Sequence, residues 1–151
     1  MTLEERIERD LKAALLQGDK PRVETLRGLK SAILYAKVAA GTREQAMPDE
    51  QVTALLAKEA KKRQESVDLY LKGDDQARAD KELAEKAIIR EYLPQQLDEA
   101  EIKRIVDAVI AVGDYQDMSA MGKVIAEVKQ KTAGAADGAT VARIVKESLG
   151  K

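Results

Sequence analysis

Ser119 and Lys123 are a pair of side chains whose types and spacing could do chemistry. Four residues apart on a helix, a serine hydroxyl and a lysine amine share one face, as in a serine nucleophile with a lysine base. Such a pair also needs an oxyanion hole and a lowered lysine pKa, so we expect Ser119 to act as a helix cap instead. The neighbouring Gly122 does not belong to a phosphate-binding loop, because Asp117 stands where that motif requires a glycine. An alternative is that free N–H groups at this helix start bind a phosphate together with Lys123.

A second candidate is a charged pair, Glu59 and Arg63, in the middle of an apolar helix stripe. The stripe spans about 60° and consists of Val52, Leu56, Val67 and Tyr70. An unpaired buried charge is costly, so the two side chains should pair or find other partners. Two interpretations stay open. One is a polar contact between helices, and the other is a groove, with Ser66 at its edge, in which Arg63 binds an anion and Glu59 positions it.

A third candidate is a group of cations on one predicted helix. Arg27, Lys30 and Lys37 lie within about 80° of arc. They could contact phosphates or form an ordinary solvated flank. Residues 20–43 hold six basic residues against Glu24 alone, and residues 118–151 hold six basic against three acidic. Local patches, rather than the net charge of −1, could therefore attract a polyanion.

The composition lacks much of the usual catalytic and metal-binding set. With 0 His and 0 Cys, the chain has neither the commonest general base nor a thiolate, and it cannot form a zinc finger. We therefore expect no catalytic residue, no metal site and no cofactor. The 4 Tyr are the only aromatic residues and offer few platforms for stacking bases.

Helical apolar spacing runs through nearly all of the 151 residues, so we predict an all-α fold. Longer helices are predicted over about 3–17, 20–40, 48–72 and 75–92, and three shorter helices follow, punctuated by Gly113, Gly134 and Gly138. The pairs Thr2–Glu5 and Asp98–Glu101 are typical of capping boxes.

The predicted break between the two modules is Leu93-Pro94, since proline removes a backbone donor and disfavours helix before it. We therefore predict an N-terminal four-helix module over 1–92 and a C-terminal three-helix bundle over 93–151. The chain has no run of about 18 apolar residues and no signal-peptide pattern at its start, so we expect no membrane span and a cytoplasmic location.

Several short motifs occur in a characteristic order along this chain. They are Leu26-Arg27, Ser31-Ala32-Ile33, the Glu59, Arg63, Ser66 series, Met121-Gly122-Lys123-Val124, Val128-Lys129, Gly134, Ala136-Asp137-Gly138, Val141 and Leu149. Together they resemble the GatB/YqeY family over the whole chain. The loop Gly134-Ala135-Ala136 departs from the family in lacking a basic residue, and Lys37 stands where Glu is frequent.

The resemblance implies an all-helical, two-domain protein. Its C-terminal module is similar to the tail of the B subunit of glutamine-dependent tRNA amidotransferase. In that enzyme the tail engages tRNA, while other domains and subunits carry out the chemistry. A link to amide transfer is therefore implied by association only.

Three interpretations of function follow. The first is a non-catalytic helical adaptor that binds tRNA or a tRNA-amidotransferase complex. Its contacts would come from Ser119, Gly122, Lys123, Lys129, Lys131, Gly138, Arg27 and Lys30. The second is a component of a carbon–nitrogen ligase that uses glutamine as amide donor on a tRNA-linked substrate. The third is a protein–protein interaction module without nucleic acid, which uses a groove at Glu59, Arg63 and Ser66.

Overall fold

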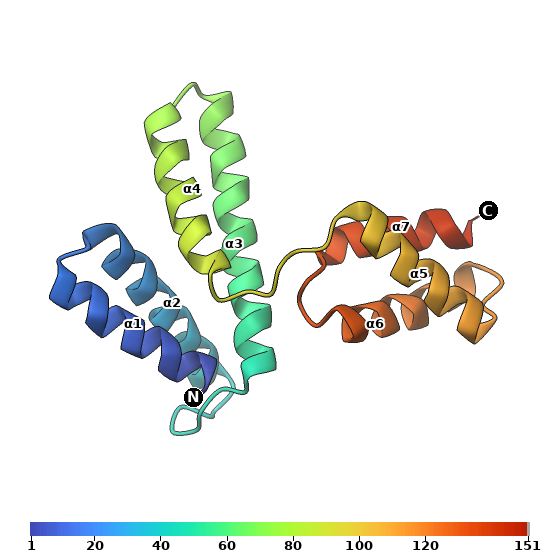
Figure 1. The fold of residues 1–151 in the computed structure, drawn as a ribbon, viewed down its shortest axis with the longest axis horizontal. Helices are drawn as coiled ribbons and strands as arrows, with labels where there is room; N and C mark the ends of the chain where they lie inside the picture. Colours follow the sequence, from blue (N-terminus) through green and yellow to red (C-terminus); the bar gives the residue numbers. More distant parts are fainter. Residues whose placement is uncertain (151) are drawn as a thin grey trace. The chain divides into compact units, whose positions relative to one another are not determined.

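The structure, a computed structural model, describes residues 1–150 and is built from helices (Figure 1). The helices are α1 (Leu3–Gln17), α2 (Lys20–Ala39), α3 (Asp49–Lys72), α4 (Gln76–Arg90), α5 (Glu99–Gly113), α6 (Met121–Thr132) and α7 (Gly138–Leu149), with a short 3-10 helix, η1 (Met118–Ala120), before α6. No strand occurs within residues 1–150, so the predicted all-α class is confirmed.

Both predicted capping boxes are present at their helix starts. The Thr2 hydroxyl oxygen accepts from the Glu5 N–H at 3.1 Å, and the Glu5 carboxylate accepts from the Thr2 N–H at 3.0 Å. Asp98 and Glu101 make the same reciprocal pair at the start of α5. These bonds satisfy N–H groups that the helix itself leaves without acceptors.

Three helix boundaries differ slightly from the predicted ones. Pro48 lies at the cap position of α3 and Asp75 at that of α4, so each of these helices begins one residue later than predicted. Gly113 is still helical, and Asp114 takes the left-handed conformation (φ 50°) that ends α5. Such shifts of one or two residues are ordinary at helix ends, where caps decide the last turn.

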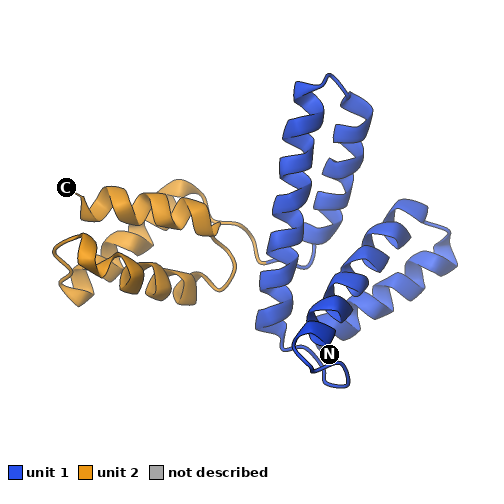
Figure 2. Ribbon diagram, turned by 180° about the vertical axis from the view of Figure 1, so that it is seen from behind, with its two compact units in different colours: residues 1–93 blue, residues 94–151 orange. Residues whose placement is uncertain are grey.

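The chain divides into two compact units, which Figure 2 shows in different colours. Unit 1, Met1–Leu93, contains α1 to α4, arranged as two helical hairpins, α1–α2 and α3–α4. Unit 2 begins at Pro94 and contains α5 to α7.

Each unit has its own hydrophobic core. In unit 1 the core joins both hairpins, and its fully buried members include Ile7, Leu26, Leu29, Leu56 and Ile89. In unit 2 the fully buried positions are all valine: Val106, Val109, Val124, Val128, Val141 and Val145. Burial of these side chains supplies the main free energy that holds the helices together.

The end of unit 1 is fixed by contacts around Tyr92, which is 4% exposed. Its hydroxyl donates to the Asp10 carboxylate at 2.6 Å, and the Arg6 guanidinium lies 4.7 Å from the centre of its ring. The adjacent Glu91 pairs with Arg22 of α2 at 2.7 Å. The segment after α4 is therefore attached to both α1 and α2.

Candidate functional site

Asp117, not Ser119, provides a capping side chain here, and it caps the short 3-10 helix η1 that precedes α6. The Asp117 carboxylate accepts from the Ser119 N–H at 2.9 Å and also from the Ser119 hydroxyl. These bonds from Ser119 hold the pKa of Asp117 below its ordinary value. The prediction that Ser119 caps the helix is wrong, because its hydroxyl donates to Asp117 and the cap position of α6 is Ala120, which makes no side-chain cap bond. Since the Ser119 hydroxyl donates to Asp117, no Ser119–Lys123 pair forms.

The candidate cations of unit 2 lie on α6. Lys123, Lys129 and Lys131 are exposed, and none of them forms an ion pair with a described residue. Gly122 is also exposed, and a β-carbon there would meet nothing within 4 Å. The space beside the Gly122 backbone in the first turn of α6 is therefore open.

Lys129 connects α6 to the beginning of α7. A β-carbon at Gly138 would lie 3.7 Å from the Lys129 amine, so the lysine tip lies beside the first residue of α7. Asp137 caps this helix by accepting from the Thr140 N–H and hydroxyl, each at 3.0 Å. A positive amine thus lies where the helix dipole is also positive. The predicted residues Lys129 and Gly138 are neighbours in space.

The cations of α2 are mostly matched by carboxylates of α1. Lys30 pairs with Glu8 at 3.1 Å, and Lys37 pairs with Glu4 at 2.7 Å. Arg27 is exposed and forms no ion pair within residues 1–150. The candidate pair Arg27 and Lys30 therefore contributes one uncompensated charge rather than a cationic flank.

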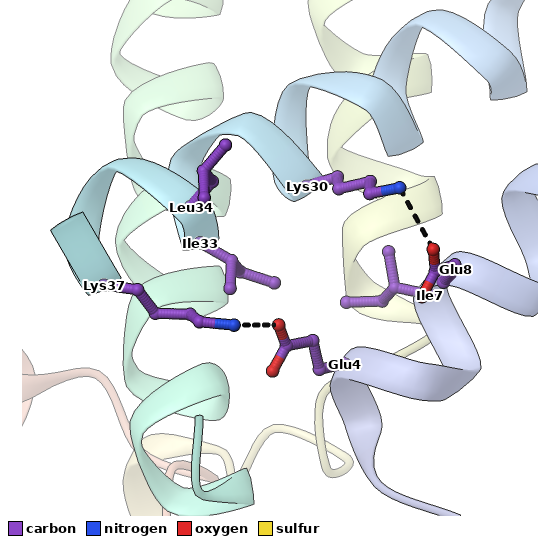
Figure 3. A pocket seen from close by; sticks show the side chains of 7 residues that line it. All are labelled: Glu4, Ile7, Glu8, Lys30, Ile33, Leu34 and Lys37. Atoms are coloured by element: carbon purple, nitrogen blue, oxygen red, sulfur yellow. Dashed lines mark hydrogen bonds and ion pairs between the residues drawn. The ribbon is translucent and has the colours of Figure 1, made fainter. Parts of the chain in front are cut away.

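Figure 3 shows the two ion pairs on either side of a hollow between α1 and α2. Its apolar lining comes from Ile7, Ile33 and Leu34, and its volume is about 180 Å³. Burial raises the pKa of Glu4, but hydrogen bonds from the Lys37 amine and the Met47 N–H outweigh it and hold that pKa below its ordinary value. Sequence reasoning missed this hollow, because Glu4 and Lys37 lie 33 residues apart.

Glu59 and Arg63 form part of a polar contact between α3 and α4. Arg63 pairs with Glu59 on its own helix and with Glu85 of α4 at 3.6 Å. A β-carbon at Gly28 would lie 3.9 Å from the guanidinium, so α2 approaches closely as well. This geometry corresponds to the interhelical contact, one of the two interpretations left open. Ser66 is partly buried one turn further along α3.

The Arg63 contact carries more negative than positive charge. Burial and the neighbouring Glu85 raise the pKa of Glu82, although Arg63 lowers it. Glu85 also lines a groove between the hairpins, of about 330 Å³, together with Pro21, Ala84 and Ile88. With two carboxylates already on Arg63, its guanidinium favours no further anion. The groove itself is lined by two lysines, Lys20 and Lys81, as well as by Glu24 and Glu85.

The family model described as "Yqey-like protein" matches residues 4–149, which is nearly the whole chain. The chain belongs to the YqeY-like family. This match confirms the YqeY part of the resemblance seen in the sequence. A comparison with curated proteins gives no match.

Two structural findings concern both units of this YqeY-like chain over the described residues. None of the helices formed by residues 1–150 is long and apolar enough to cross a membrane. In the same part of the chain, no group of three or more His, Cys, Asp or Glu side chains is placed to hold a metal ion.

Proposed function

We propose that this YqeY-like protein is a non-catalytic helical adaptor that binds tRNA through the α6–α7 surface of unit 2. The observation that carries the proposal is the Lys129 amine beside Gly138 at the start of α7. Lys123 and Lys131 are exposed on the same helix as Lys129. An uncompensated amine beside a helix N-terminus is a suitable contact for a phosphate group.

Recognition would depend on phosphates and shape rather than on base stacking. Tyr115 is the only aromatic residue of unit 2, and its hydroxyl donates to Glu127 at 2.8 Å. Its ring packs against the core of the unit, so no exposed aromatic side chain is left there for an unstacked base. Sequence preference within the bound RNA should accordingly be weak.

The test measures binding of bulk tRNA to the full-length protein at several salt concentrations. Phosphate contacts release counterions, so the logarithm of the affinity should fall linearly with the logarithm of the salt concentration. Lys129→Gln should weaken binding and reduce the slope by about 1. Lys103→Gln is the matched control, because Lys103 is also an exposed lysine of unit 2 but is paired with Asp107 at 2.8 Å.

Two results would contradict the proposal. One is no retention of tRNA even at low salt. The other is an equal effect of Lys129→Gln and Lys103→Gln, which would mean that net charge alone governs binding.

A further inference from the structure

The hollow between α1 and α2 plays no part in the proposed tRNA contact. Ile7 and Ile33, which are 1% and 2% exposed, lie beneath it, and Leu34 lines it (Figure 3). Its volume of about 180 Å³ is below the range of about 300–1,000 Å³ that is usual for small-molecule sites. The hollow therefore suits a single aliphatic side chain rather than a free metabolite.

Apolar side chains continue from the hollow along the outer face of α2. Leu34, Tyr35 and Val38 are 45%, 80% and 55% exposed. Leu34 and Val38 are one helical turn apart and therefore lie on the same face. Isolated exposed apolar residues need no explanation, but a cluster beside a hollow is typical of an interaction surface.

The charges around the hollow are balanced at one end and unbalanced at the other. Glu4 with Lys37 and Glu8 with Lys30 close it on two sides. Lys12 follows Glu8 by one turn on α1, and Arg27 lies one turn before Lys30 on α2. Because the hairpin is antiparallel, both of these residues lie toward its turn.

Lys12 and Arg27 are the source of this imbalance. Both are exposed, and neither forms an ion pair with another residue of the described chain. An apolar hollow thus has two uncompensated positive charges about one helical turn away. A partner that fills the hollow with an aliphatic group gains favourable electrostatic interactions as well if it carries acidic groups at that spacing.

We propose that this outer face of the α1–α2 hairpin docks an amphipathic helix of a partner protein. An aliphatic side chain of that helix enters the hollow beside Ile33 and Leu34. Acidic side chains one turn away lie next to Lys12 and Arg27, which fixes the direction in which the helix binds. Buried aliphatic anchors supply most of the affinity in such complexes, and rim charges supply association rate and register.

A polyanion such as tRNA fits this surface less well than an acidic helix. Phosphates would use Lys12 and Arg27 but would leave the apolar side chains in water. Two carboxylates, Glu4 and Glu8, also lie on the same face. The combination of apolar and acidic groups is available from an amphipathic protein helix.

The probe is a display library of short stapled helical peptides selected on the full-length protein. Each peptide has one aliphatic anchor position, and Asp, Glu, Lys and Ser are randomised at the surrounding positions. Selection should enrich Asp or Glu at three or four residues from the anchor. Binding of an enriched peptide is then measured by fluorescence anisotropy.

Two pairs of variants localise the binding. Leu34→Ser should weaken the enriched peptide about tenfold or more, whereas Leu69→Ser, at an exposed leucine of α3, should not. The double variant Lys12→Glu, Arg27→Glu should reject the acidic peptide and bind its Lys-substituted counterpart. The double variant Lys58→Glu, Lys61→Glu on α3, at two exposed lysines without an ion pair in residues 1–150, is the matched charge control.

Several outcomes would overturn the proposal. Enrichment of basic peptides, or of peptides indifferent to Leu34→Ser, would exclude the acidic anchor helix. Binding of tRNA that Lys12→Glu, Arg27→Glu weakens more than Lys129→Gln does would assign the surface to RNA. Self-association abolished by Leu34→Ser in sedimentation experiments would make a second copy of the chain the occupant. The outcome is independent of the Lys129 experiment, since the two tests use different units.

Discussion

Tyr92 shows how one residue can fix the end of a unit. Its hydroxyl donates to Asp10, and its ring lies under Arg6. Burial and the Asp10 carboxylate raise the pKa of Tyr92 above its ordinary value, so it stays protonated and remains a donor. Burial raises the pKa of Asp10, but the bonds from Tyr92 and Arg9 outweigh it and hold that pKa below its ordinary value.

Tyr92→Phe should therefore lower the free energy of unfolding by about 1–2 kcal/mol at neutral pH. The lowered pKa of Asp10 contributes stability above the unfolded-state pKa of about 3.9, and this contribution is lost as pH falls through the folded-state value. The difference between wild type and Tyr92→Phe should consequently shrink below about pH 4. Urea titrations of both proteins at several pH values measure this difference in the free energy of unfolding. Tyr35→Phe is the control, since Tyr35 is 80% exposed, and an equal loss there would exclude the Asp10 bond as the cause.

Asp117 has two opposite effects at the start of α6, one on stability and one on the proposed RNA contact. Asp117→Ala removes the acceptor of the Ser119 N–H, and the loss of a capping side chain costs about 1 kcal/mol. The same change removes a negative charge six residues before Lys123 in the chain, so affinity for tRNA should rise while thermal stability falls. Circular dichroism melting and tRNA binding are measured on the same sample. Asp117→Asn, which keeps an acceptor oxygen for the Ser119 N–H but removes the charge, should raise the tRNA affinity with a smaller loss of stability, and a loss of affinity in Asp117→Ala would contradict the proposed interface.

At the scale of helices, local sequence patterns predicted where the helices lie. They did not predict which residues pair between helices. The signals that predicted the helices depend on residues a few positions apart in the sequence. They are the apolar periodicity and the capping boxes Thr2–Glu5 and Asp98–Glu101, and the helices they predicted are present. The partner of Lys37 is 33 residues away, and that of Arg63 on α4 is 22 residues away. Which faces meet depends on how the hairpins pack, which spacing within one helix does not encode.

The two ion pairs between α1 and α2 differ in burial and should differ in strength. Lys37 is 12% exposed and Glu4 26%, whereas Lys30 and Glu8 are 55% and 48% exposed. Lys37→Ala leaves a partly buried carboxylate that still accepts from Met47, and should cost about 1–3 kcal/mol. Lys30→Ala should cost under about 1 kcal/mol.

Chemical denaturation of both variants checks this order, and pH adds a second test. The pKa of Glu4 is lowered in the folded protein, so its stabilisation is present above the unfolded-state value of about 4.3 and is lost in acid. The cost of Lys37→Ala should therefore diminish below about pH 4. Equal costs for the two lysine variants would show that burial does not set the strength of these pairs.

The whole molecule consists of two units with separate cores, and the two proposed surfaces lie on different units. No residue of the first core belongs to the second. The proposed RNA surface lies on α6 and α7, and the proposed docking face lies on α1 and α2. Functions carried by separately stabilised units should be separable by cutting the chain between them.

A chain cut between Leu93 and Pro94 should therefore give two fragments with different binding properties. The fragment 94–151 should retain helical circular dichroism, melt cooperatively and bind tRNA with the salt slope of the full-length protein. The fragment 1–93 should bind the enriched acidic helix and lose the salt-dependent tRNA contact. If fragment 94–151 folds but binds no tRNA, the proposed interface is wrong. If fragment 1–93 alone retains tRNA, the exposed cations of unit 1 rather than those of α6 carry the contact.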